Sequence, residues 1–199
     1  MKLTPETTDA LRELINIGVG RAAGVLSEML NCRIILQVPF IKVLQQHELL
    51  NEMDGQLGRN RVSAVRLGFK GSFAGMAALV FPPDSAVKLV NVLTSEGPDT
   101  DDLDAVRVGT LSEVGNIVIN GVMGSISNVL SQHINYSLPA YMEDVIENLL
   151  LADAKDRDST VLVAHTRFIV EDMQIEGDII LIFETASFDA LIHAIDKHS

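Results

Sequence analysis

Residues 11–39 read LRELINIGVGRAAGVLSEMLNCRIILQVP, and residues 111–139 read LSEVGNIVINGVMGSISNVLSQHINYSLP. Aligned without gaps, the two stretches share nine residues over 29 positions, whereas composition alone gives about two. We therefore predict a single domain, residues 1–199, made of two related repeats at about 1–97 and 98–199. The nine shared residues, each matched 100 positions later, are Leu11, Glu13, Asn16, Ile17, Gly24, Ser27, Leu30, Ile34 and Pro39.

Each half of the sequence has the same predicted order of elements. Thr4 is a typical N-cap with Pro5 in the first helical position, and Thr100 precedes two acidic residues in the same way. Duplicated helices and strands predict an α+β fold: an antiparallel β-sheet, two long helices and a pseudo-two-fold axis. Beyond the first helix of each half, the predicted segments are strands 33–43, 62–70 and 73–81 with a hairpin turn at Gly71-Ser72, polar loop 54–58 and helix 84–93, then strands 133–140, 160–170 and 177–183, polar loop 153–158 and helix 187–195.

The composition excludes several partners. Fifteen Lys and Arg against 27 Asp and Glu give a net charge of −12, which repels nucleic acid and anionic lipid on average. Aromatic residues make up only 5 % and Trp is absent, so a base-stacking platform is not expected. We find no signal peptide and no run of about 20 apolar residues, and therefore expect a cytoplasmic chain without membrane insertion.

Metal and cofactor chemistry find little support in the sequence. Cys32 is the only cysteine, which excludes an internal disulfide and a cysteine-cluster zinc site and favours a half-buried structural thiol near a helix end. The five histidines show no metal-ligand spacing. Gly18, Gly20 and Gly24 imitate a phosphate-binding loop, but they lie within a helical pattern. We expect this chain to hold no cofactor and no metal.

The first long helix is predicted to have a core face and an opposite polar stripe. The stripe contains Asp9, Glu13, Asn16 and Gly20, continuing past Gly24 to Ser27 with Ala23 at its flank, and so combines two carboxylates and an amide with very small side chains. The predicted core face contains Leu11, Leu14, Ile15, Gly18, Ala22, Val25, Leu26 and Met29.

The second long helix repeats this arrangement. Glu113, Asn116, Asn120, Gly124 and Ser127 form its polar stripe, while Gly109 stands where the first helix has Asp9. Its predicted core face contains Leu111, Val114, Val118, Val122, Ile126 and Val129.

Two interpretations of the stripes remain open on the residues alone. Polar pairs three residues apart are common on solvated helices, so the stripes are explained equally well as plain surface inherited by duplication. However, Asn and Gly cost helix stability on an exposed face, and a repeated Glu-x-x-Asn there favours a functional surface.

At these residues the sequence resembles the CheC/CheX/FliY family of chemotaxis phosphatases. The family motif is Asp or Ser, three residues, Glu, two residues, Asn, twenty-two residues and Pro. Asp9, Glu13, Asn16 and Pro39 fit it in full, and Glu113, Asn116 and Pro139 fit it with Gly109 at the first position. The two sites and the length make the chain resemble CheC most, and the resemblance spans both halves.

The resemblance implies an enzyme, a protein aspartyl-phosphate phosphatase that acts on a phosphorylated CheY-like response regulator in chemotaxis and two-component signalling. It implies that Asn16 orients the attacking water, that Glu13 binds a lysine of the regulator, and that Asp9 supports the contact. Asn116 and Glu113 are the corresponding residues of a second site. Mg²⁺ is expected on the regulator, and a CheD-like protein is a further partner that the family allows.

Two rival functions stay open. The flagellar switch protein FliM has a CheC-like domain without catalytic residues, so the alternative is a non-catalytic module that binds receiver domains or the flagellar switch. A metal-dependent hydrolase is the other rival, but it needs a His/Asp cluster. Because Gly109 cannot supply the contact of Asp9, we predict that the first site contributes more of the activity than the second.

Overall fold

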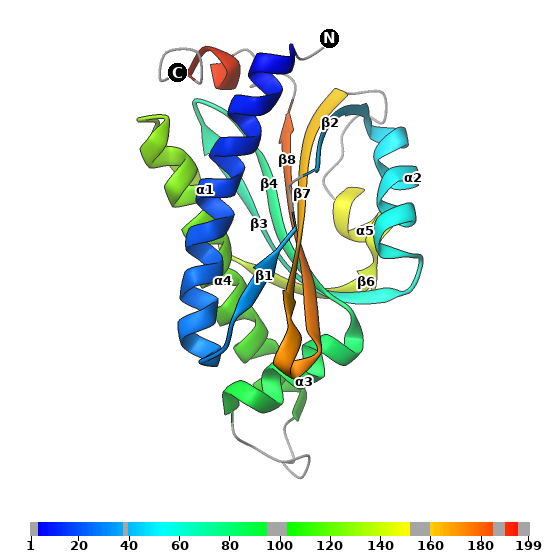
Figure 1. Ribbon diagram of the computed structural model, residues 1–199. Helices are drawn as coiled ribbons and strands as arrows, with labels where there is room; N and C mark the ends of the chain where they lie inside the picture. Colours follow the sequence, from blue (N-terminus) through cyan, green and yellow to red (C-terminus); the bar gives the residue numbers. More distant parts are fainter. Residues whose placement is uncertain (1–3, 38–39, 95–102, 152–159, 185–189, 195–199) are drawn as a thin grey trace.

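The computed structural model of this chain describes residues 4–37, 40–94, 103–151, 160–184 and 190–194. Pro39, the junction near residues 95–100 with the predicted cap Thr100, and the predicted loop 153–158 lie outside the described residues. The described chain forms a mixed fold of helices and an antiparallel sheet, which confirms the predicted fold class (Figure 1).

Eight strands form one sheet in the order β1-β7-β8-β4-β3-β5, with β2 also paired to β7 and β6 also paired to β3. The strands are β1 (Ile34–Leu36), β2 (Phe40–Gln45), β3 (Arg61–Gly71), β4 (Gly75–Phe81), β5 (Ile134–Tyr136), β6 (Ala140–Val145), β7 (Thr160–Val170) and β8 (Ile175–Glu184). The helices are α1 (Pro5–Leu30), α2 (Gln46–Leu57), α3 (Pro83–Thr94), α4 (Leu103–Val129) and α5 (Ile146–Leu151), with a 3-10 turn at Glu171–Met173.

The two halves of the chain exchange edge strands. In the first half, β2 pairs with β7 of the second half and not with the β3–β4 hairpin that follows it in the sequence. In this pairing Phe40 lies opposite His165. In the second half β6 pairs with β3 in the same manner, with Val145 opposite Arg61. Each half therefore completes the sheet of the other.

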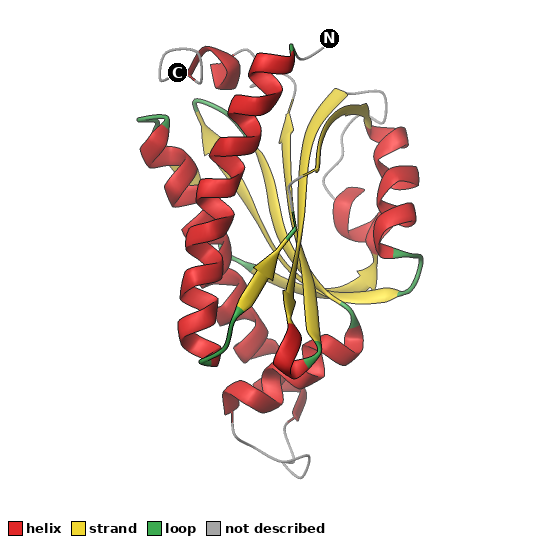
Figure 2. Ribbon diagram, viewed as in Figure 1, coloured by secondary structure: helices red, strands yellow, loops and turns green. Residues whose placement is uncertain are grey.

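The sheet lies between two helical layers (Figure 2). One face is covered by α1, α4 and α3, and the larger apolar core lies there, with buried side chains that include Leu11, Val118 and Phe81. The other face is covered by α2 and α5 over a smaller core that includes Leu49 and Val163. Within the described part of the chain, no helix is long and apolar enough to cross a membrane.

Local signals place both ends of α1. The Thr4 hydroxyl accepts a hydrogen bond from the Thr7 amide at 3.2 Å and Pro5 follows, which confirms the predicted start. At the other end Asn31 adopts a left-handed conformation with φ 49°, and the Cys32 amide donates to the Ser27 carbonyl at 3.2 Å. Cys32 is half-buried beside this helix end, as predicted.

The predicted core faces are largely confirmed, with one error on α1. Val25 is 39 % exposed, whereas Val19, which the helical wheel left out of that face, is buried. The helical wheel predicts the core face as if α1 packed against one flat surface. Because α1 packs against both the sheet and α4, its buried face is rotated toward the angle between them. Met29 and Val129 are half-buried at the margin.

The sequence missed α2 and α5. The predicted polar loop 54–58 is wrong, because α2 continues to Leu57 and ends only at Gly58, whose φ of 76° favours glycine. The start of α2 is fixed by the Gln45 amide, which donates to the Glu48 carboxylate at 2.8 Å. The predicted strand 33–43 is divided into β1 and β2, and the predicted strand 133–140 contains β5 and only the first residue of β6, which continues to Val145. Of the predicted helix 187–195, residues 190–194 are described and helical.

Candidate functional site

The predicted polar stripe of α1 lies on the solvent side. Asp9, Glu13 and Asn16 are all exposed, on the helix face away from the buried Leu11 and Leu14. The Arg12 guanidinium donates to the Asp9 carboxylate at 2.7 Å. This ion pair between residues three positions apart on the helix holds the Asp9 side chain next to Arg12.

Glu13 and Asn16 have side chains that are free to bind another molecule. Being three residues apart on a helix, they point to the same side. Within the described part of the chain, neither side chain has a hydrogen-bond or ion-pair partner. One acceptor carboxylate and one amide that can both donate and accept therefore stand side by side in solvent.

The stripe of α4 differs in detail. Glu113 is exposed, while Asn116 is half-buried and its Oδ1 accepts a hydrogen bond from Asn120 Nδ2 at 2.7 Å. At Gly109 an added Cβ would meet nothing within 4 Å, so the space that Asp9 fills on α1 is empty on α4. The two sites are thus related but not equivalent.

The glycines of the stripes are not required by packing. An added Cβ at Gly20, Gly24 or Gly124 would meet no atom within 4 Å. By contrast, Gly18 on the buried side of α1 has no such room, because its Cβ would lie 3.0 Å from the Val122 carbonyl oxygen. Glycine lowers helix stability, so its use at open positions of the stripe favours a surface that another molecule approaches closely.

The shared serines of the stripes have a structural explanation. The Ser27 hydroxyl donates to the Cys32 carbonyl at 2.5 Å, and the Ser127 hydroxyl donates to the Gln132 carbonyl in the same way. Both hydroxyls close the carboxyl end of their helix. Their recurrence 100 residues apart is therefore explained by the fold, without a docking role.

The two long helices are antiparallel and packed against each other (Figure 1). Gly18 of α1 touches Val122 of α4, and Gly121 of α4 faces Ala22 of α1. The amino-terminal half of α1 therefore lies beside the carboxyl-terminal half of α4. As a result, the Glu13/Asn16 and Glu113/Asn116 sites lie toward opposite ends of the pair, on one helical layer.

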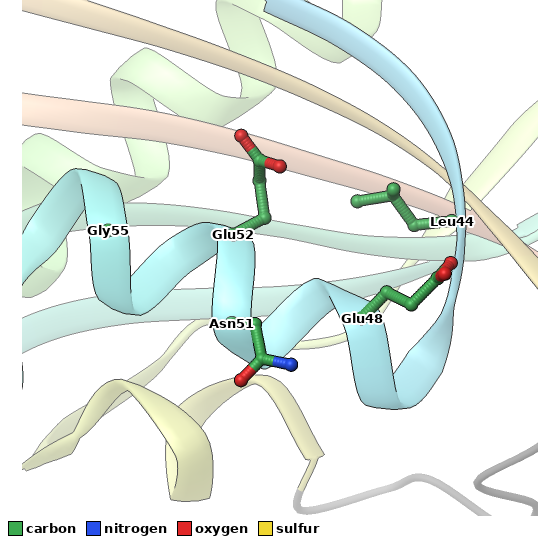
Figure 3. A pocket seen from close by; sticks show the side chains of 5 residues that line it. All are labelled: Leu44, Glu48, Asn51, Glu52 and Gly55. Atoms are coloured by element: carbon green, nitrogen blue, oxygen red, sulfur yellow. The ribbon is translucent and has the colours of Figure 1, made fainter.

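A hollow of the surface lies elsewhere on the molecule. A hollow of about 480 Å³ is lined by Leu44, Glu48, Asn51, Glu52 and Gly55, on the α2 side of the sheet (Figure 3). Lys42 neutralises Glu52 through an ion pair of 2.9 Å. Among the described residues, no three His, Cys, Asp or Glu side chains are arranged to hold a metal ion. The hollow contains no residue of the helix stripes.

Sequence reasoning missed one neighbour of the site, and for the other it left open only that Asn120 replaces the contact that Gly109 cannot make. Arg12 was not considered, although its spacing of three residues from Asp9 is the spacing of helical ion pairs. Asn120 was placed correctly on the stripe, and its spacing of four from Asn116 is again that of facing side chains.

Comparison with known proteins gives three independent matches. Residues 6–43 match the CheC-like family, a span that begins just before Asp9 and contains Glu13 and Asn16. The CheY-P phosphatase CheC of Bacillus subtilis (strain 168) is 29 % identical over 144 residues, which are 70 % of this chain and 68 % of that protein. The Thermotoga maritima FliY structure covers 100 % of both chains with a TM-score of 0.79 at 18 % identity.

The resemblance to the CheC/CheX/FliY family is confirmed. A CheC-like fold is also present in CheX from a CheX-CheY-BeF3-Mg complex of Borrelia burgdorferi, with a TM-score of 0.55, 21 % identity and coverage of 86 % and 98 %. The FliM middle domain of H. pylori has it as well, with a TM-score of 0.66, 12 % identity and coverage of 96 % and 99 %. Differently named proteins share this fold, so the fold alone does not assign a function to the chain.

Proposed function

We propose that this CheC-like chain is a phosphatase that removes the phosphoryl group from the aspartate of a CheY-like response regulator. The observation that carries the proposal is the exposed Glu13–Asn16 pair, whose side chains have no partner within the described part of the chain. The similarity to a CheC named as a CheY-P phosphatase supports the same substrate. The complex of CheX with CheY supports a receiver domain as partner of this fold.

The reaction is hydrolysis of an acyl phosphate. Water attacks phosphorus, the bond between phosphorus and the aspartyl oxygen breaks, and the products are the free carboxylate and dihydrogen phosphate. Phosphoryl transfer has a loose transition state, so placing a water in line supplies much of the catalysis. Asn16 suits this task, because its amide oxygen accepts a hydrogen bond from the water and its amide nitrogen donates one to a phosphoryl oxygen. A carboxylate at that position would repel the phosphoryl oxygens.

Glu13 is assigned to docking. The exposed carboxylate stands one turn before Asn16, where it binds a lysine ammonium of the regulator and sets the position of the amide. Asp9, held by Arg12, supports the same contact from the preceding turn. Glu113 and Asn116 form the second site on α4. Mg²⁺ is supplied by the regulator in this proposal, and a CheD-like second partner stays a prediction.

The assay is the decay of a ³²P-labelled acyl phosphate on receiver domains of the source organism, with Mg²⁺ present. We expect this chain to accelerate the decay of at least one receiver catalytically, so that one molecule turns over many phosphoryl groups. Glu13→Gln should raise KM for the phosphorylated receiver more than it lowers kcat, since the amide cannot form the ion pair. Glu147→Gln, at an exposed glutamate of α5 on the other face of the sheet, is the matched control.

The second candidate is a non-catalytic module that binds receiver domains. It is favoured by the FliM middle domain, which shares the fold. Tight binding to a receiver activated with beryllium fluoride, without any acceleration of acyl-phosphate decay, would establish this alternative and overturn the phosphatase.

A further inference from the structure

Asn120 follows Asn116 by one helical turn on the same stripe. Its Nδ2 donates a 2.7 Å hydrogen bond to Asn116 Oδ1. The equivalent residue of α1 is Gly20, where an added Cβ would meet nothing within 4 Å, so Asn16 has no such neighbour. This side-chain bond is a difference between the sites that the repeat itself does not predict.

We propose that Asn120 is a positioning residue of the second site, which holds the Asn116 amide ready for the water; this role rests on the proposed function. The terminal torsion of an asparagine is broad and roughly two-fold, so a free amide exchanges its oxygen and nitrogen between two directions. The bond from Asn120 fixes the oxygen of Asn116 on one side. The NH₂ group of Asn116 is then turned away from Asn120.

The hydrogen-bonded Asn116 amide still has free donor and acceptor groups for the contacts that the reaction needs. An amide oxygen has two lone pairs and an amide nitrogen has two protons. After one lone pair of Asn116 is engaged, the other remains to accept from water, and both N–H groups remain for phosphoryl oxygens. The oxygen of the exposed Asn120 is a further acceptor beside it. The second site therefore offers two coupled amides where the first offers one.

The supporting residue then precedes the Glu-x-x-Asn motif in the first site and follows it in the second. On α1, support comes from Asp9, one turn before Glu13 and paired with Arg12. On α4 that place is Gly109, and the support comes from Asn120, one turn after Asn116. This explains how the second site keeps Glu113 and Asn116 in use although its first motif residue is missing.

The test isolates the second site in an Asn16→Ala background. There, Asn120→Ala should lower kcat about fivefold, the effect of one hydrogen bond in a transition state, with KM and Tm unchanged. Asn120→Gln, which keeps the donor on a longer stem, should restore part of kcat. Asn51→Ala, at an exposed asparagine of α2 on the other face of the sheet, is the matched control and should leave kcat as it was. In an Asn116→Ala background, Asn120→Ala should add no further loss.

A second readout does not depend on activity. In ¹H–¹⁵N spectra, the side-chain NH₂ protons of Asn120 should exchange with solvent faster, and shift, when Asn116 is replaced by Ala. An unchanged kcat for Asn120→Ala in the Asn16→Ala background would overturn the positioning role while leaving the phosphatase intact. An Asn16→Ala protein with no activity would also overturn it, because Asn120 would then serve no working site. A wild-type chain that accelerates no receiver would reject the proposed function itself, and the role of Asn120 with it.

Discussion

A Cβ added to Gly18 would lie 3.0 Å from the carbonyl oxygen of Val122, so α1 and α4 approach each other backbone to backbone at this point. This contact sets how the two long helices sit on the sheet. It thereby sets the directions in which both polar stripes face.

Gly18→Val should destabilise the protein. The added side chain has to displace the backbone of α4, and overpacking of this kind costs about 1–3 kcal/mol. Gly24→Val on the same helix is the control: its Cβ meets no atom within 4 Å, so the free energy of unfolding should change by less than about 0.5 kcal/mol. Urea unfolding of the two variants gives both values, and equal losses would mean that the helices do not pack as described.

Asp178 should be a stability determinant unrelated to the proposed reaction. Asp178 is 1 % exposed, and its carboxylate contacts His165 at 2.8 Å and Arg167 at 3.0 Å. Asp178→Ala leaves buried polar partners uncompensated and should lower the free energy of unfolding by about 3 kcal/mol.

The control for Asp178 is a surface ion pair. Asp54 binds the exposed Arg59 at 2.8 Å, so Asp54→Ala should cost less than about 1 kcal/mol. If thermal unfolding ranked the two substitutions the other way, the buried cluster would not have the role assigned to it.

Cys32 should react slowly with alkylating reagents. Burial, and to a lesser degree the Asp172 carboxylate, raise the pKa of the Cys32 thiol. A raised pKa leaves less thiolate at a given pH, and the thiolate is the reactive form. The rate of iodoacetamide labelling should therefore rise with pH through a higher midpoint in the folded chain than in urea. A midpoint at or below that of the unfolded chain would contradict this assignment.

The two amides to which we assign the positioning of water, Asn16 and Asn116, should contribute unequally. Asn16→Ala should remove most of the phosphatase activity and Asn116→Ala only a minority, because Gly109 provides no counterpart to the Asp9–Arg12 pair. Within its own site, loss of either amide should cost about 10²–10³ in rate, by analogy with removed oxyanion donors. Rates of both variants at one receiver concentration decide the order. A larger loss for Asn116→Ala would mean that α4, aided by Asn120, is the main active surface.

The long helices and the main hairpin were predictable because their signals are local. The cap at Thr4 and the apolar spacing from Leu11 to Leu26 determine α1, and Gly71 ends β3 where a turn was expected. The exchange of β2 and β6 was not predictable, because the pairing of Phe40 with His165 joins residues that no local pattern relates. Because residues 46–57 are largely polar, the sequence did not predict α2. The helix that packs against it, α5, lies in the other half of the chain.

The site was predictable to the level of the helix face. Glu13 and Asn16 lie exposed where the wheel placed them, since a polar stripe on a long helix follows from its period alone. The wheel could not separate residues that serve the fold from those available to a partner. Ser27 closes its own helix, and Gly24 remains without a packing role. Only coordinates make that distinction, because it depends on contacts across α1 and α4.

The most direct measurement compares hydrolysis and binding for the double variant Asn16→Ala/Asn116→Ala. We expect this variant still to bind a receiver activated with beryllium fluoride, because Glu13 and Glu113 are intact, while the ³²P-labelled acyl phosphate decays at the rate of the receiver alone. A double variant that accelerates the decay as much as the wild-type chain would contradict the claim that these two amides position the attacking water.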